Sequence, residues 1–307
     1  MESFPNIFAV HTLSSDIGKL VRFLQQKGIL ATRYTCPKCG GGMKLAPRKD
    51  IGDGLTWKCC KKQLHKILVQ RTLRKGSWFA FSKMSLSRVF DLTYIWVAQL
   101  SQKNMKVLVD GSISSATVTD WYSFCREICI GTLLNRPQTQ IGGSGHVVEI
   151  DESKLAKRMY TRGNHVEGHW VIGGVDRETK ECFLVTVEDR TRGTLLGVLR
   201  DNVLPGTTIC SDPWEACGSL EDEGYLHVSV KRSESFKRSL PLKIRNKEML
   251  GSHLAEYVYR KWRFHNKSME ERFHAYLDDI AAVYPPATSD ELDSSSPEQA
   301  GTSENSC

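Results

Sequence analysis

The clearest alternation of hydrophobic and polar residues lies between residues 147 and 230. Five short runs there are apolar, rich in β-branched residues and separated by turn residues, as strands are. Between the third and fourth runs, the segment TRGTLLGVLRDNV has apolar residues at helical spacing. The pattern therefore predicts a helix there and five strands around it: VVEID, HWVIGGVD, CFLVTVEDR, TTICSD and GYLHVSV.

Two longer amphipathic segments follow the last predicted strand, KEMLGSHLAEYVYRKWRFH and SMEERFHAYLDDIAAVY, and both predict helices. The predicted order is β-β-β-α-β-α-β-α. This order is typical of an α/β protein with an RNase H-like fold, in which helices flank a mixed sheet. We place this core at residues 145–286.

The N-terminal part of the chain has a different pattern. Residues 1–33 predict a helical lead-in, and residues 34–80 hold cysteines in a Gly- and Lys-rich context that predicts a zinc-ribbon-like segment. Residues 81–140 contain two stretches with helical spacing around a turn at Asp110-Gly111. That arrangement fits a helix-turn-helix, the DNA-binding motif, and it fits any small helical bundle equally well.

Charge is segregated along the chain, whose formal net charge is +7. Residues 1–150 carry 21 Lys/Arg against 9 Asp/Glu, whereas residues 151–287 carry 21 of each. A basic front half joined to a neutral core favours a nucleic-acid partner, although a solvated basic surface has the same composition. Residues 287–307 are acidic and rich in Ser and Pro, so we expect them to be disordered.

Composition also bears on the compartment of the protein. We find no apolar run of the roughly 20 residues that a membrane span needs, and no secretory signal peptide at the N-terminus. We therefore expect no membrane partner and a reducing compartment, which would be the nucleus in a eukaryotic host. There the ten cysteines are expected to be thiols or metal ligands rather than disulfides.

Two aspartates end predicted strands that lie side by side in an RNase H-like sheet. Asp151 ends the first strand and Asp212 ends the fourth. Their carboxylates would converge on Mg²⁺ or Mn²⁺, because these hard cations prefer oxygen ligands and meet substrate phosphates directly. Two such ions catalyse phosphodiester cleavage and strand transfer. The alternative is that Asp151 caps a strand end and Asp212 is a turn residue before Pro213.

The segment Cys36-Pro-Lys-Cys39-Gly resembles one half of a zinc site. A zinc ribbon needs a second pair of ligands about 15–20 residues further on. Cys59 and Cys60 lie at that distance but are adjacent, and neighbouring residues of a strand face opposite sides. Only one of the two would reach the ion, and His65 could supply the fourth ligand. The alternative is a loop without metal.

A basic stretch follows the cysteine cluster and contains no acidic residue. Two tryptophans, Trp57 and Trp78, flank it. Phosphate contacts from such a stretch would be sequence-independent and sensitive to salt. A solvated basic hairpin is the alternative. The candidate DNA-binding residues are Lys58, Lys61, Lys62, Lys66, Arg71, Arg74 and Lys75.

Several segments together resemble the DDE transposases of the Merlin group and their bacterial insertion-sequence (ISXO-like) relatives. The likeness covers roughly residues 34–286, and its most specific part runs from the IDES segment at Asp151 to the SDPW segment at Asp212. The resemblance implies that these two aspartates are the first and second catalytic acids. It also implies binding of terminal-repeat double-stranded DNA through the N-terminal half, cut-and-paste transposition, and a homo-oligomer as a reasonable assembly.

The chain departs from that family pattern after the fifth predicted strand. The family continues there with an Asn-His-Ser segment and then His-Thr-x-x-Ile-Glu, whose Glu is the third catalytic acid. Here Lys231 and Arg232 stand where the Asn-His would be, and relative to the family pattern a block is missing before the last helices. Glu248 lies at a plausible distance from Asp212, but its surroundings match the later helix of the family. Glu256 is a weaker substitute.

Three functions are compatible with these features. The first is a transposase-derived protein that binds DNA without cutting it, which the missing acid favours. The second is an active Mg²⁺-dependent transposase in which Glu248 or Glu256 replaces that acid. The third is a non-enzymatic zinc and helical interaction protein, which the basic N-terminal half disfavours.

Overall fold

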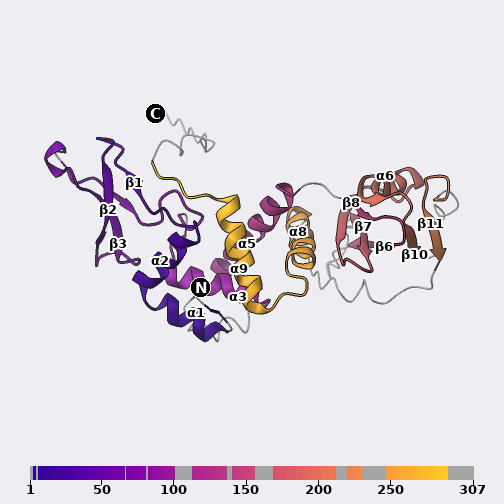
Figure 1. Cartoon of the computed structure of the whole chain (residues 1–307), viewed down its shortest axis with the longest axis horizontal. Helices are drawn as coiled ribbons and strands as arrows, with labels where there is room; N and C mark the ends of the chain where they lie inside the picture. The colour runs from indigo at the N-terminus through magenta and orange to yellow at the C-terminus, as the bar shows by residue number, and fades with distance from the viewer. Residues whose placement is uncertain are drawn as a thin grey trace, which may run out of the picture. The chain divides into compact units, whose positions relative to one another are not determined.

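We describe the protein from a computed structural model (Figure 1). Its contacts divide the chain into two compact units, residues 1–121 with 269–307 and residues 122–268. None of the described helices is long and apolar enough to cross a membrane. The residues that the structure describes are 3–4, 6–65, 67–80, 82–100, 113–136, 140–155, 169–211, 220–229 and 247–289.

Four helices build most of the first unit: α1 (Ile7–Ser14), α2 (Ile17–Gln26), α3 (Leu86–Val97) and α9 (Met269–Val283). Three of them begin at a side chain that accepts a hydrogen bond from the backbone of the first helical turn. These N-caps are Asn6, Asp16 and Ser85. Such caps satisfy backbone N–H groups that have no partner within the helix, and each typically stabilises a helix by about 1 kcal/mol.

Aromatic side chains from distant parts of the sequence form the centre of the helical cluster. Phe273 of α9 packs edge-on against Phe4, Phe90 and Tyr94, with ring centroids between 5.0 and 5.5 Å apart. We expected the helix around Phe273 to close the RNase H-like core. By its contacts it is grouped with the first unit, because its aromatic face packs on α3.

α3 is buried over most of its surface, and only Ser87, Arg88 and Asp91 of its twelve residues are partly exposed. Nine of its side chains are buried, from Leu86 to Val97, and Thr93 accepts a hydrogen bond from the indole of Trp121 at 3.2 Å. Trp121 lies in α5 (Ser115–Leu134), the next described helix. A helix buried in this way cannot lie in a DNA groove, and the turn at Asp110-Gly111 falls outside the described residues. The helix-turn-helix prediction is therefore not confirmed.

A four-stranded antiparallel sheet completes the first unit. Its strands are β1 (Tyr34–Thr35), β2 (Gly42–Pro47), β3 (Leu55–Cys59) and β4 (Gln70–Thr72), in the order β1-β2-β3-β4. A short 3₁₀ helix, η1 (Lys62–Leu64), lies in the loop between β3 and β4. One face of the sheet is buried through residues such as Met43, Trp57 and Val69.

The second unit contains a five-stranded mixed sheet whose spatial order is β11-β10-β6-β7-β8. β6, β7 and β8 are antiparallel neighbours, and β10 and β11 run parallel to β6. Numbered along the chain the spatial order is 3-2-1-4-5, as expected for the RNase H-like fold. The five strands are β6 (Val147–Leu155), β7 (His169–Asp176), β8 (Cys182–Val187), β10 (Thr208–Ser211) and β11 (Leu226–Ser229).

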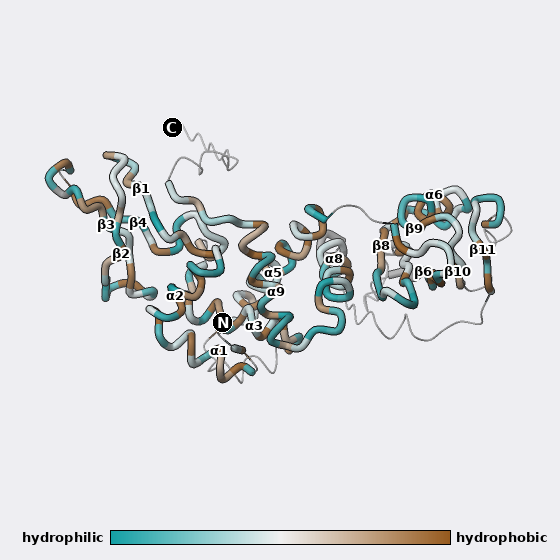
Figure 2. The backbone as a smooth tube through the Cα atoms, viewed as in Figure 1, coloured by the Kyte–Doolittle hydropathy of each residue, from teal (hydrophilic) through white to brown (hydrophobic). Residues whose placement is uncertain are grey.

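Helix α6 (Arg192–Asn202) covers one face of this sheet. Leu195 and Leu199 pack there with Val148, Ile150 and Ile209 in one hydrophobic core, and Figure 2 shows hydrophobic residues along β6, β8 and α6. After α6, a two-residue strand pairs with the segment before β6. This small parallel pair consists of β5 (Ile141–Gly142) and β9 (Val203–Leu204).

Helix α8 (Lys247–Arg263) packs beside β8, at the edge of the sheet away from β10 and β11. Its C-terminal half is held to the end of α5 by charged and aromatic contacts. The guanidinium of Arg136 lies 4.4 Å from the ring centroid of Trp262 and also binds Glu181, which precedes β8. These contacts fix α8 on the β8 side of the unit.

Candidate metal centres

The first candidate centre begins at a tight turn between β1 and β2. The backbone N–H of Cys36 donates to the carbonyl of Gly41 at 2.8 Å, and the N–H of Gly40 donates to the carbonyl of Cys36 at 2.9 Å. Gly40 has a φ of 63°, a left-handed conformation that glycine adopts without steric cost. This turn explains the Gly after the Cys-x-x-Cys segment and brings the thiols of Cys36 and Cys39 to one side.

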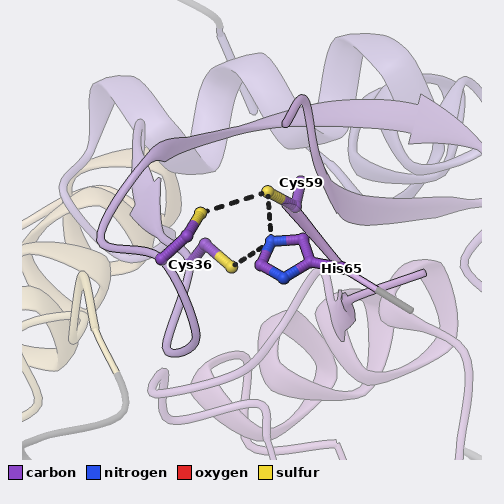
Figure 3. Close-up of side chains that lie close together, drawn as sticks. Cys36, Cys59 and His65 are labelled. Atoms are coloured by element: carbon purple, nitrogen blue, oxygen red, sulfur yellow. Dashed lines mark hydrogen bonds between the residues drawn. The ribbon is translucent and has the colours of Figure 1, made fainter. Parts of the chain in front are cut away.

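The other half of the centre comes from the loop between β3 and β4. Cys59 ends β3, and its backbone N–H donates to the carbonyl of Val69 at 3.0 Å, which closes the base of the loop. After η1 the chain turns back, so that His65 Nε2 lies 3.3 Å from Cys59 Sγ. Figure 3 shows Cys36, Cys59 and His65 with their side chains directed toward one another.

Three thiols and one imidazole thus form a compact group: the ligand atoms of Cys36, Cys39, Cys59 and His65 all lie within 4.8 Å of one another. Around tetrahedral zinc, with bonds of about 2.3 Å to sulfur and 2.0–2.1 Å to nitrogen, ligand atoms would be about 3.6–3.8 Å apart. The sulfurs of Cys39 and Cys59 are 3.7 Å apart, and Cys36 Sγ is 3.6 Å from His65 Nε2. The spacing therefore fits a zinc ion.

The thiols of this group differ in acidity. Burial opposes ionisation of Cys36, but the backbone N–H groups of Lys38 and Cys39 and the nearby thiols lower its pKa below the usual value. Burial, reinforced by the Cys36 and Cys39 thiols, raises the pKa of Cys59 to about 11. Without a cation, three close thiols cannot all ionise, whereas zinc binds them as thiolates.

Cys60 lies outside the group. Its side chain is exposed, whereas that of Cys59 is buried. The cause is the alternation of neighbouring residues at the end of a strand, which directs Cys59 toward Met43 and the buried face. His65, rather than Cys60, is the fourth member of the group. Of the two adjacent cysteines that are candidate zinc ligands, Cys59 lies in the group and Cys60 lies outside it.

The side chains of the basic stretch differ in how accessible they are in the folded structure. Arg74 does not offer its charge to a partner, because its Nε binds Asp53 at 2.7 Å and its Nη1 donates to the carbonyl of Met84 at 2.9 Å. Trp57 and Trp78 are 3% and 7% exposed, so neither can stack on a base. Lys62 and Lys66 have side chains outside the described residues.

Lys58 has an unusual neighbour for a basic residue. In the register of β2 and β3, Lys58 stands directly opposite Lys44, whose side chain is exposed. Like charges directly opposite each other in a sheet are destabilising. The two lysines together create positive potential on the exposed face of the sheet, at a cost in stability. Lys44 was missed from sequence, because only the strand register pairs it with Lys58.

The second candidate centre contains Asp151. The sequence predicted that Asp151 ends its strand, but it lies in the middle of β6, because β6 stays paired with β7 as far as Leu155. Strand alternation places Val148 and Ile150 in the core under α6, so Asp151 faces the other side of the sheet with Glu149. Its Oδ1 accepts the backbone N–H of Glu152 at 2.8 Å. Asp151 is partly exposed and lies on the face of the sheet opposite α6.

The strand register of β10 and β6 shows which residues of the two strands lie side by side, and this concerns the predicted pair, Asp151 and Asp212. Cys210 pairs with Glu149, and Arg177 contacts both side chains, so the two face the same side of the sheet. Asp151 lies two residues after Glu149 in β6, and Asp212 follows Cys210 by two residues in the sequence. β10 is described as far as Ser211, and Asp212 lies outside the described residues.

The two predicted substitutes for a third acid lie in α8. The side chain of Glu248 falls outside the described residues, although its backbone belongs to the start of the helix. Glu256 is already engaged, because its Oε1 accepts from Arg260 Nε at 2.8 Å and its Oε2 lies 3.9 Å from buried Arg126. A carboxylate held between two guanidinium groups would have to leave them to bind a metal.

Comparisons with known proteins were made against curated sequences and solved structures. No curated protein matches the chain. The catalytic core domain of HTLV-2 integrase, solved in complex with magnesium, is 12% identical with a TM-score of 0.28, over 41% of this chain and 97% of that one. A simian T-cell lymphotropic virus intasome, solved in complex with the PP2A regulatory subunit B56 gamma, is 11% identical with a TM-score of 0.25, over 70% of this chain and 78% of that one.

A family model gives the more specific result. It covers residues 140–281, which include all five strands of the mixed sheet, the helices α6 and α8, and the candidate acids Asp151 and Asp212. The predicted transposase resemblance is thus confirmed at the level of this domain and not at that of the Merlin group. Residues 140–281 match the ISXO2-like transposase domain.

Proposed function

We propose that the chain is a transposase-derived DNA-binding protein whose RNase H-like core keeps two catalytic aspartates and lacks the third acid. The observation that carries the proposal is the register of β6 and β10. It pairs Cys210 with Glu149, two residues before Asp212 and Asp151 in the sequence, inside the segment that matches a transposase domain. Sequence alone predicted the same pair from the two strand ends.

Asp151 and Asp212 are the residues that would hold Mg²⁺ or Mn²⁺. When bound, such an ion activates a nucleophile and stabilises the leaving oxygen of a phosphodiester. Asp151 suits this role because it is partly exposed and lies on the face of β6 away from the α6 core. Two carboxylates are enough to position one ion through a few oxygen ligands and water.

Catalysis by two ions needs a further carboxylate, and Glu256, the candidate whose side chain the structure describes, is already engaged. The resemblance indicates that the block carrying the family's Glu is missing after the fifth strand. Glu256 is tied to Arg126 and Arg260, and α8 packs beside β8, two strands away from β6. Glu248 remains the one substitute that an active enzyme could use. We therefore assign the protein DNA binding without efficient strand cleavage.

The DNA-binding surface that we propose is the four-stranded sheet with its zinc centre. Its exposed face carries Lys44 opposite Lys58, and Lys61 and Lys75 follow along the same segment. Arg71 pairs with Trp57 and so faces the other side of the sheet. A zinc ion held by three thiolates and an imidazole would fix the turn after β1 to the loop after β3. Arg74 is excluded from this surface, because Asp53 binds it in the interior.

The proposal is tested by the salt dependence of binding to a mixed-sequence DNA duplex. We expect log K to fall linearly with log[salt], as phosphate contacts require, with a slope of about −0.9 per contact. Replacing Lys44 and Lys58 together by Gln should make the slope shallower by about 1–2 units. The Asp151→Asn variant, measured with zinc loaded and without added Mg²⁺ or Mn²⁺, is the control and should bind as the intact protein does. Binding that is absent, or that does not depend on salt, would refute the proposed function.

A further inference from the structure

The loop between β3 and β4 exposes three large apolar side chains within five residues. Leu64 is 66% exposed, Ile67 is 74% exposed and Leu68 is 44% exposed. Single exposed apolar residues are common, but several gathered on one loop mark an interaction site. The fold of the first unit makes no use of them, because its aromatic centre and the buried face of the four-stranded sheet are built by other residues.

The loop is held in shape from both sides. Its base is closed by the hydrogen bond from Cys59 to Val69, and its first turn by the bond from the N–H of Leu64 to the carbonyl of Lys61. Between Leu64 and Ile67, His65 turns inward to the thiols of the candidate zinc centre. The metal-binding side chain therefore anchors the loop, and the apolar residues on either side of it point outward.

The charge around these residues identifies the partner. Residues 58–75 contain no Asp/Glu and seven Lys/Arg, of which Arg74 is neutralised by Asp53, and Lys44 adds a further charge opposite Lys58. A second copy of the chain would bring the same positive charges to the interface and be repelled. A polyanion is attracted to this charge, and duplex DNA also offers an apolar interior between its stacked bases.

We propose that the loop Lys61–Leu68 is a wedge that places Leu64, Ile67 and Leu68 against the bases in the minor groove of duplex DNA. The flanking lysines would hold the phosphates on both sides of the groove. Architectural proteins insert Leu, Ile, Phe or Met between base steps in this way, partly unstacking and bending the duplex. The inference rests on the proposed DNA binding and adds to it the site and the mode of contact.

The test compares the intact zinc-loaded protein with the triple variant Leu64→Ser, Ile67→Ser, Leu68→Ser. Binding to a mixed-sequence duplex that carries 2-aminopurine is measured at several salt concentrations. Loss of apolar burial should weaken binding roughly tenfold or more, while the slope of log K against log[salt] stays unchanged because no phosphate contact is lost. The rise in 2-aminopurine fluorescence that reports unstacking should disappear. Phe8→Ser, which removes a 77% exposed apolar side chain from α1, should change neither measurement.

The outcomes separate the inference from the proposed function. If the intact protein binds in a salt-dependent manner and the triple variant binds equally tightly, the wedge is refuted and DNA binding stands. A variant that retains DNA binding but alters the oligomeric state would also refute the wedge. If the intact protein does not bind DNA, the proposed function fails first. Zinc content and the thermal unfolding midpoint of the variant must match those of the intact protein, because the three side chains are exposed.

Discussion

The carboxylate of Asp53 joins three segments of the first unit. Its Oδ2 binds Arg74 Nε at 2.7 Å, its Oδ1 accepts the N–H of Leu86 at the start of α3 at 2.9 Å, and 7% of its side chain is exposed. Asp53→Ala would leave a buried guanidinium without its counterion. We expect the free energy of unfolding to fall by about 3–5 kcal/mol, as for other buried pairs broken on one side. Denaturant unfolding followed by circular dichroism measures this change.

The matched control is the ion pair between Arg48 and Asp50 in the same segment. Its partners are 39% and 67% exposed, so water and salt screen the interaction. Asp50→Ala should therefore leave unfolding nearly unchanged. Equal effects of the two substitutions would show that Asp53 has no special structural role.

At the residue scale, the sequence predicted which residues belong to a site better than it predicted which partners their side chains contact. Spacing was enough to find Cys36, Cys39 and Cys59, because zinc ligands recur at characteristic intervals. It could not exclude Arg74 from the DNA-binding set, since that residue is neutralised by Asp53, which belongs to a different segment. The engagement of Glu256 by Arg126 was hidden for the same reason, because the contact joins α5 to α8.

At the scale of the element, the loop after β3 should depend on zinc. We expect the purified protein to bind one zinc ion for each chain. Chelation should increase amide hydrogen exchange in residues 34–72, because the ion links the turn after β1 to this loop. The mixed sheet around β6 should keep its protection, because it belongs to a separate unit with its own core. Zinc content by metal analysis and hydrogen exchange with mass spectrometry measure the two effects.

Two adjacent cysteines provide the control for the zinc prediction. Cys59→Ser should abolish stoichiometric zinc binding, whereas Cys60→Ser should leave it intact, because Cys60 is exposed and outside the cluster. Equal zinc loss in both variants would contradict the assigned ligand set.

At the scale of the element, strands were easier to predict from the sequence than the elements against which helices pack. β-branched runs bounded by turns specify strands locally, so all five strands of the mixed sheet were found. The packing partner of α9 was not, because an amphipathic face indicates only that a helix packs against something apolar. Its aromatic residues, Phe273 and Tyr276, pack against α3.

At the scale of the whole molecule, we propose that one unit binds DNA and that the other is a transposase-like core with two of the three catalytic acids. The order of elements predicted the topology of that core, because few sheet arrangements accommodate it. The loss of the third acid was inferred from the family resemblance, because a deletion does not change the hydrophobic periodicity of the segments that remain. Losing a ligand of the second ion would misplace the attacking water, and a displacement of about 1 Å can slow a reaction on the order of 100-fold.

The most direct test of this account is a strand-cleavage assay with Mg²⁺ or Mn²⁺ on a duplex carrying the terminal inverted repeat of a matching element. The intact protein is assayed beside its Asp151→Asn and Glu248→Gln variants, with binding to the same duplex measured in parallel. The account predicts that all three proteins bind the DNA and that none cleaves it efficiently. Robust metal-dependent cleavage by the intact protein, lost in both variants, would contradict it and would identify Glu248 as the third acid of an active transposase.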